Sequence, residues 1–223
     1  RENGVNHLAS SFPEEEAFHW LHPWHGGIMT MIHVPGERYP GIAASETFEA
    51  SEVSQTDGYG ITWYGVRQRS ALAHEEARGL ILELDTLTVG GSPIVKHVLR
   101  LVNETTSVRK IEAGWIAFVQ PDGDMSNTAL HAEGYQRNRS PRSPSIDGKH
   151  WAAAQNPDTG RAIALVSPTL SVAIDDWGTG GGHLKQRLHH TVLPEDKIEM
   201  TGYFAIAENR DEMQGYAALR HVV

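Results

Sequence analysis

The sequence predicts an all-β fold, namely a large antiparallel β-sandwich with one or two short peripheral helices. The 223-residue chain carries 22 glycines and 11 prolines, and the intervals between them hold short runs rich in valine, isoleucine, threonine, tyrosine and tryptophan. Such runs between turn-forming residues are typical of strands, and several alternate apolar and polar residues with the two-residue period of a strand. Because a chain of this length fits one large β domain, we expect residues 1–223 to form a single β-sandwich.

The first half of the chain contains four predicted strands, at residues 60–66, 80–87, 94–103 and 111–120. In the second run, leucines at alternate positions from Leu80 to Leu84 indicate one buried face. Glu83 and Glu112 lie within otherwise apolar runs, so each either faces solvent on the outer side of a sheet or lines a polar concave face. We favour the solvent-facing interpretation. A turn is expected at Gly90-Gly91, and a second one at residues 121–124.

The second half of the chain contains four more predicted strands, at residues 150–155, 161–166, 171–175 and 197–207. The first two flank an Asn-Pro-Asp-Thr-Gly turn at residues 156–160, which predicts a hairpin. Helix signals occur only near the ends of the chain. A capped, acidic first turn at residues 11–16 and the stretch 209–220 predict the two short helices.

Composition narrows the classes of function. Nineteen basic and 28 acidic residues give a formal charge of −9, which disfavours nucleic acid as a partner. No segment approaches the roughly 18–20 apolar residues of a membrane span, so we expect a soluble protein. The absence of cysteine fits both a reducing cytoplasm and a bacterial extracellular location. The first residue, Arg1, is consistent with a domain excised from a longer protein that contains other domains.

Residues 18–27 form the leading candidate site, because they combine three histidines and two tryptophans with a glycine pair. Trp20 and Trp24 supply flat apolar rings on which a sugar ring can stack, while His22 and His25 supply hydrogen-bonding groups. The alternative is that both tryptophans only cover a β-sheet core.

A second candidate lies at residues 175–183, where a glycine-rich run separates Trp177 from His183. The run matches neither phosphate-binding glycine pattern, so we interpret it as a mobile loop that borders a ligand groove. Together the predicted ligand-binding residues are Trp20, His22, Trp24, His25, Trp177 and His183.

We predict no cofactor and no metal, but a divalent metal is the alternative. His19, His22 and His25 are spaced three apart, a spacing at which a helix would let neighbouring pairs share an ion. Pro23 disfavours that helix. In this second hypothesis the protein is a metal-assisted enzyme on a β-sandwich or cupin-like barrel, with His183 as a further ligand and water as the nucleophile. No G-x-S-x-G serine motif is present, and catalytic residues are not assigned.

The segment 134–148 is a basic loop in an acidic protein. Arg137, Arg139 and Arg142 are either solvated or contact an anionic ligand or an acidic partner surface. The second interpretation gives a third hypothesis, a noncatalytic protein-interaction domain.

Short motifs at residues 99–105 and 193–200 resemble those of the galactose mutarotase-like β-supersandwich group, which includes aldose epimerases. The resemblance extends in style over residues 60–207. His25-Gly26-Gly27 also matches a triplet that lines the sugar site of the epimerases, whereas their histidine-tyrosine signature has no counterpart. The resemblance therefore implies a carbohydrate-binding domain with a sugar groove at His25, acting on or presenting a sugar within a larger carbohydrate-active protein. Any enzymatic activity it implies is that of a sugar epimerase, isomerase or other carbohydrate-active enzyme.

Overall fold

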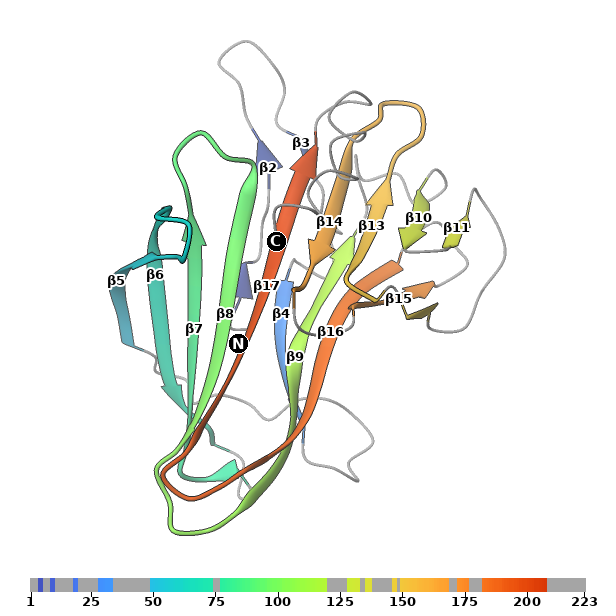
Figure 1. Ribbon diagram of the computed structural model, residues 1–223. Helices are drawn as coiled ribbons and strands as arrows, with labels where there is room; N and C mark the ends of the chain where they lie inside the picture. Colours follow the sequence, from blue (N-terminus) through green and yellow to red (C-terminus); the bar gives the residue numbers. More distant parts are fainter. Residues whose placement is uncertain are drawn as a thin grey trace. The chain divides into compact units, whose positions relative to one another are not determined.

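The chain folds into an all-β, antiparallel β-sandwich, as predicted (Figure 1). The computed structural model describes residues 4–5, 9–10, 18–19, 28–33, 49–73, 77–119, 128–132, 135–137, 146–147, 149–168, 172–176 and 182–207. Within these residues there are seventeen strands and no α-helix. The two predicted helices, at 11–16 and 209–220, lie outside the described residues.

The strands are β1 (Gly4–Val5), β2 (Ala9–Ser10), β3 (Phe18–His19), β4 (Ile28–His33), β5 (Glu49–Thr56), β6 (Thr62–Ala71), β7 (Leu80–Thr88), β8 (Ile94–Asn103), β9 (Arg109–Val119), β10 (Ala129–Ala132), β11 (Tyr135–Arg137), β12 (Ile146–Asp147), β13 (Trp151–Gln155), β14 (Ala162–Val166), β15 (Val172–Asp176), β16 (Gly182–Val192) and β17 (Lys197–Ala207).

The chain forms two compact units. Unit 1 comprises Arg1–Asn3, Thr30–Gly114 and Arg187–Tyr203, and unit 2 comprises Gly4–Met29, Trp115–Gln186 and Phe204–Val223. This division describes compactness, whereas the predicted single domain concerns a segment that folds on its own. The single domain therefore stays a prediction.

In unit 1, neighbouring strands follow the order β17-β8-β7-β6-β5, so β5 lies at a sheet edge. The four strands β5 to β8 form an antiparallel meander with continuous registers. Antiparallel neighbours need only short connections, and the Gly90-Gly91 turn between β7 and β8 supplies one, with Gly91 at φ 77°. The predicted turn at this position is confirmed.

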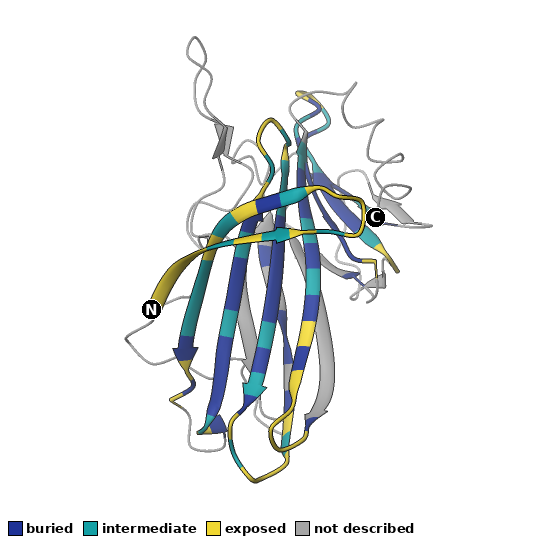
Figure 2. Ribbon diagram, turned by 60° about the vertical axis from the view of Figure 1, so that its left-hand side comes forward, coloured by how far each residue is buried: buried dark blue, intermediate teal, exposed yellow. Residues whose placement is uncertain are grey.

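One face of this meander is an apolar core. Leu82 is directly opposite Leu101, and Leu84 is directly opposite Leu99. All four side chains are at most 4% exposed. Each buried leucine contributes about 1.5–3 kcal/mol to folding. The pattern is visible in Figure 2, where dark blue, buried residues dominate the long strands of the sheet.

The two motifs that suggested the supersandwich resemblance are joined by hydrogen bonds. The Asn103 side chain, at the end of β8, donates to the carbonyl oxygens of Val192 and Leu193 at 3.2 and 3.1 Å. The Asn103 backbone also pairs with Glu195 and Asp196 in the turn between β16 and β17. This network ties the end of β8 to the Pro-Glu-Asp turn.

In unit 2, neighbouring strands follow the order β11-β10-β13-β14-β17, and a second set follows β16-β15-β12. The hairpin β13–β14 is confirmed, with Trp151 opposite Val166 and Gln155 opposite Ala162. The side-chain amide oxygen of Asn156 stabilises its turn by accepting a hydrogen bond from the Asp158 backbone at 2.9 Å.

Nine strands were not predicted from the sequence, namely β1 to β5, β10, β11, β12 and β16. Two of them, β11 and β12, lie within the segment 134–148 that was taken for a basic loop. A third, β16, begins at Gly182, inside the segment taken for a glycine-rich loop. The ends of that segment are paired strands, since Asp175 in β15 is opposite His183 in β16. Among the described residues, no helix is long and apolar enough to cross a membrane.

Candidate functional site

The opposite face of the unit 1 meander carries a cluster of charged side chains. We call it the charged face, and it consists of Arg67, Arg69, Glu83, Asp85, Arg100 and Glu199. The register produces it, because directly paired residues share one face of a sheet. Arg67 is opposite Asp85, while Glu83 is opposite both Arg69 and Arg100. Acidic residues of β7 thus lie between basic residues of β6 and β8.

Asp85 is the centre of the charged face. Its side chain is fully buried, yet it is surrounded by donors. Arg67 donates through Nε to Oδ1 at 2.6 Å and through Nη2 to Oδ2 at 2.9 Å, a bidentate pair. Arg100 donates through Nη1 to Oδ2 at 2.6 Å. The amide of Gln55 in β5 donates to the same oxygen at 2.7 Å. One carboxylate therefore fixes side chains from three other strands of the sheet.

Two further acidic side chains, those of Glu199 and Glu104, lie at the solvent-exposed edges of the charged face. Glu199 in β17 accepts from Nε of Arg100 at 2.6 Å, and its side chain is 46% exposed. On the other side, Arg69 lies 3.5 Å from Glu83 and 2.9 Å from Glu104. Each arginine of the face thus has at least one carboxylate partner.

The hydrogen bonds between Asp85 and its arginine partners determine the charge state of Asp85. Burial alone would raise the pKa of Asp85, but the hydrogen bonds and positive charges of Arg67 and Arg100 outweigh it and hold the pKa below its usual range. The hydrogen bond to Asp85 in turn raises the pKa of Arg67. Asp85 is therefore an ionised residue at neutral pH, and both of its oxygens are occupied. It suits the positioning of arginines better than proton transfer or nucleophilic attack.

An aromatic cluster adjoins the charged face. The Trp63 indole packs with Leu87 and Val98, and its ring centroid lies 5.9 Å from that of Tyr203. The Lys96 ammonium lies 5.6 Å from the Trp63 ring centroid, within range of a cation–π interaction. Burial lowers the pKa of Lys96, and the negative charge of Asp57 opposes that shift.

Asp57 joins this cluster to the β5–β6 turn. Its carboxylate accepts from the Trp63 indole nitrogen at 3.0 Å and from the backbone nitrogens of Tyr59 and Ile61. The hydrogen bond from Trp63 lowers the pKa of Asp57. Because Trp63 is only 6% exposed, its ring braces the sheet and offers no open stacking surface.

Most of the site residues predicted from the sequence lie outside the part of the chain that the structure describes. Trp20, His22, Trp24, His25 and Trp177 lie outside the described residues. His19 is in β3 and His183 is in β16, and only their backbone positions are described. The ligand-binding role of these residues therefore stays a prediction.

The metal and partner hypotheses also stay predictions. Among the described residues, no three histidine or acidic side chains are grouped so that they could hold a metal ion. Of the three loop arginines, Arg137 is in β11, while Arg139 and Arg142 lie outside the described residues.

The charged face was not identified from the sequence, although one signal for it was present. Glu83 alternates with leucines, and we favoured a solvent-facing position for it. In the structure its side chain is only 18% exposed and has ion pairs with Arg67 and Arg69. The alternation of Glu83 and Asp85 with Leu82 and Leu84 indicates two different faces, but the chain order does not show which cations lie opposite.

Solved structures with a similar fold include carbohydrate-active enzymes. No protein-family model and no curated protein sequence matches the chain. An α-N-acetylgalactosaminidase from Bifidobacterium bifidum aligns with 99% of this chain and 37% of its own, at 15% identity and a TM-score of 0.64. A GH36 α-galactosidase from Geobacillus stearothermophilus aligns with 89% of this chain and 33% of its own, at 6% identity and a TM-score of 0.55.

A proposed aldose 1-epimerase from Klebsiella pneumoniae aligns over 82% of this chain and 69% of its own, at 8% identity and a TM-score of 0.54. At these identities the likeness concerns the fold alone. The chain spans little more than a third of the length of the Bifidobacterium enzyme. The resemblance to the galactose mutarotase-like β-supersandwich, expected from two short motifs, is confirmed at the level of the fold.

Proposed function

We propose that this chain is a carbohydrate-binding β-sandwich domain that presents a sugar within a larger carbohydrate-active protein. The observation that carries the proposal is the charged face, where guanidinium donors alternate with carboxylate acceptors at fixed positions. A sugar hydroxyl both donates and accepts hydrogen bonds, so a surface that offers both kinds of group in alternation suits a polyol.

The pairing of charges favours a neutral ligand over an anionic one. Arg67, Arg69 and Arg100 each have a carboxylate partner within 4.0 Å. A phosphate or carboxylate ligand would have to displace those partners and leave them unpaired, which is costly. A neutral sugar can instead bind to the remaining lone pairs and N–H groups without breaking the ion pairs.

The fold comparison supports the same proposal. The neighbours named above include two glycosidases, one of them crystallised with raffinose, and each is much longer than this chain. A domain that covers about a third of such an enzyme suits a supporting role in binding.

Calorimetric titration with D-galactose, N-acetyl-D-galactosamine and raffinose tests the proposal. We expect Glu199→Gln to weaken binding about tenfold, since it replaces an exposed carboxylate acceptor with a neutral group of the same shape. Lys110→Gln is the matched control, because Lys110 is exposed in β9, outside the charged face. No heat of binding with any of the three sugars, or equal losses in both variants, would refute the assignment.

Variants of the ligand-binding residues predicted at 18–27 are tested in parallel. If Trp24→Ala and His25→Ala weaken sugar binding while Glu199→Gln does not, the ligand lies at residues 18–27 and the charged face is a structural feature. An elemental scan of the same protein by plasma mass spectrometry checks the metal alternative. A stoichiometric metal lost in His22→Ala would favour the metal-assisted enzyme.

A further inference from the structure

The β5–β6 hairpin exposes an unusual amount of apolar surface. Large hydrophobic side chains that are exposed in the described part of the chain are Tyr59, Ile61, Tyr64, Val66, Val108 and Leu193. The first four belong to this one hairpin, within residues 59–66. Scattered single apolar residues need no explanation, whereas a cluster on one element indicates a contact surface.

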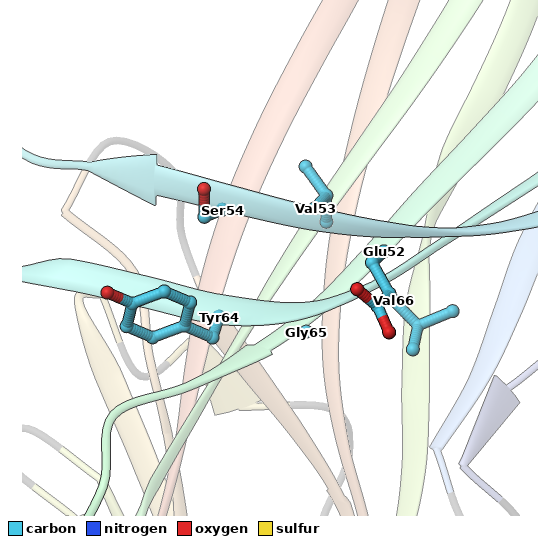
Figure 3. A pocket seen from close by; sticks show the side chains of 6 residues that line it. All are labelled: Glu52, Val53, Ser54, Tyr64, Gly65 and Val66. Carbon is cyan, nitrogen blue, oxygen red and sulfur yellow. The ribbon is translucent and has the colours of Figure 1, made fainter.

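A hollow of about 390 Å³ lies on this hairpin, lined by Glu52, Val53, Ser54, Tyr64, Gly65 and Val66 (Figure 3). The register places Ser54 opposite Tyr64 and Glu52 opposite Val66, so these four side chains share one face. The charged face is on the other side of the sheet, because Arg67 and Asp85 belong to the alternate positions of β6 and β7.

The floor of the hollow is backbone. Val53 and Gly65 pair between the two lining pairs, and their positions direct side chains to the other face of the sheet. A Cβ at position 65 would collide with the carbonyl oxygen of Thr86 in β7. Glycine is therefore required by the close approach of β6 to β7.

We propose that this hollow is a second carbohydrate subsite, in which a pyranose ring stacks on Tyr64 and forms hydrogen bonds with Glu52 and Ser54. Tyr64 is 62% exposed, so its ring is available, unlike that of Trp63. Figure 3 shows Tyr64 beside Ser54 and Val66 beside Glu52, so apolar and polar groups line the same space. Sites for small ligands combine an apolar wall with a few polar groups in this way.

The size of the hollow favours a small ligand over a protein. Its volume falls within the range of roughly 300–1,000 Å³ that is usual for small-molecule sites. A stable protein partner would need about 800 Å² of buried surface on each side. The lining is also mixed in polarity, with a carboxylate and a hydroxyl between the apolar groups, whereas the centre of a protein interface is depleted of charge.

The hairpin is preorganised to hold such a ligand. In its turn, the Asp57 carboxylate accepts hydrogen bonds from the backbone nitrogens of Tyr59 and Ile61 at 2.9 and 3.0 Å. Gly60, at φ 82°, donates its backbone N–H to the Asp57 carbonyl oxygen. A fixed hairpin loses little conformational entropy on binding. The subsite extends the proposed function to another surface, but it requires none of the residues of the charged face.

Two-dimensional amide NMR on the full chain tests the subsite, with methyl α-D-galactopyranoside, N-acetyl-D-galactosamine and raffinose as probes. We expect shifts of the amides at 52–54 and 64–66 at millimolar sugar. Tyr64→Ala should weaken binding there about tenfold, whereas Tyr64→Phe should retain it, because the ring carries the stacking. Tyr59→Ala is the control, since Tyr59 is 85% exposed and does not line the hollow.

This experiment tests the charged face and the hollow independently of each other. Shifts at residues 67, 85 and 100 report on the charged face, and shifts at 52–54 and 64–66 report on the hollow. Absence of the hairpin shifts with all three sugars would overturn the subsite, whatever happens at the charged face. Equal weakening by Tyr59→Ala and Tyr64→Ala would overturn it too. So would concentration-dependent broadening of the hairpin signals without sugar that Tyr64→Ala removes, because the hairpin would then be a protein contact.

Discussion

Asp85 shows how one residue determines the character of a surface. A carboxylate with no exposed side-chain area is costly unless it is paired, and Asp85 is paired with two guanidiniums and an amide. The three donors come from β5, β6 and β8. The same carboxylate therefore orients the arginines and links the strands that carry them.

Replacing this carboxylate should destabilise the fold strongly. Asp85→Asn removes the negative charge between Arg67 and Arg100 while preserving the side-chain shape, so it leaves two neighbouring cations without their shared partner. We expect the free energy of unfolding to fall by about 3–5 kcal/mol, as measured by urea denaturation. Glu104→Gln is the control, since Arg69 and Glu104 form an exposed pair worth at most about 1 kcal/mol. Similar losses in the two variants would show that Asp85 contributes no more than a surface ion pair.

At the scale of elements, the end of β8 is held by the turn before β17. Asn103 is fully buried and uses its side-chain nitrogen for three carbonyl oxygens, those of Ser107, Val192 and Leu193. Its side-chain oxygen accepts from the backbone nitrogen and the hydroxyl of Thr105. One side chain thus fixes two connections that are about ninety residues apart in sequence.

Removing this link should loosen both connections together. Asn103→Ala leaves the carbonyl oxygens of Val192 and Leu193 without their donor, and we expect a loss of about 2–4 kcal/mol in the free energy of unfolding. Hydrogen exchange should accelerate at the amide of Glu195, which donates to the Asn103 carbonyl oxygen. Thr105→Ala provides a comparison, because it removes only hydroxyl contacts at the half-exposed end of the network. If Asn103→Ala changes neither stability nor exchange at Glu195, the turn is held by other contacts.

Across the whole molecule, the strands predicted best from the sequence are those that carry a clear apolar pattern in their own residues. The expected ranges 94–103 and 197–207 coincide with β8 and β17. In contrast, β5 has the sequence EASEVSQT and is mostly exposed, so no apolar alternation marks it. It is a strand because it pairs with β6, and pairing is a tertiary property. The glycines at 180–182 suggested a loop, although Gly182 begins β16.

The charged face was harder to predict for a related reason. The Glu83 and Asp85 positions could be assigned to one face from the alternation of β7 alone. Their partners come from other strands, with Arg67 eighteen residues from Asp85 and Glu199 ninety-nine residues from Arg100. A single sequence specifies the period of each strand, but it does not specify which strands become neighbours.

The stability of the fold at acidic pH depends on titratable groups on both faces of the sheet. His97 lies on the core face, fully buried, and burial lowers its pKa from 6.5 to about 4. Because the folded state favours the neutral imidazole, the stabilisation is complete above pH 6.5 and is lost as the pH falls toward about 4. The full shift corresponds to about 3 kcal/mol. The pKa of Asp85 is lowered below its usual range, so its contribution is lost only at still lower pH.

Unfolding free energies measured from about pH 7 down to about pH 5 should therefore decline with acidification, and His97→Gln should flatten that decline because its amide cannot be protonated in this range. His131 is a matched comparison, since burial also lowers its pKa, although a hydrogen bond with Gln155 opposes the shift. His131→Gln should flatten the decline less. A profile of equal slope in the wild type and in His97→Gln would mean that His97 gains a proton without cost, and that the core face around it admits water or a counter-charge on acidification.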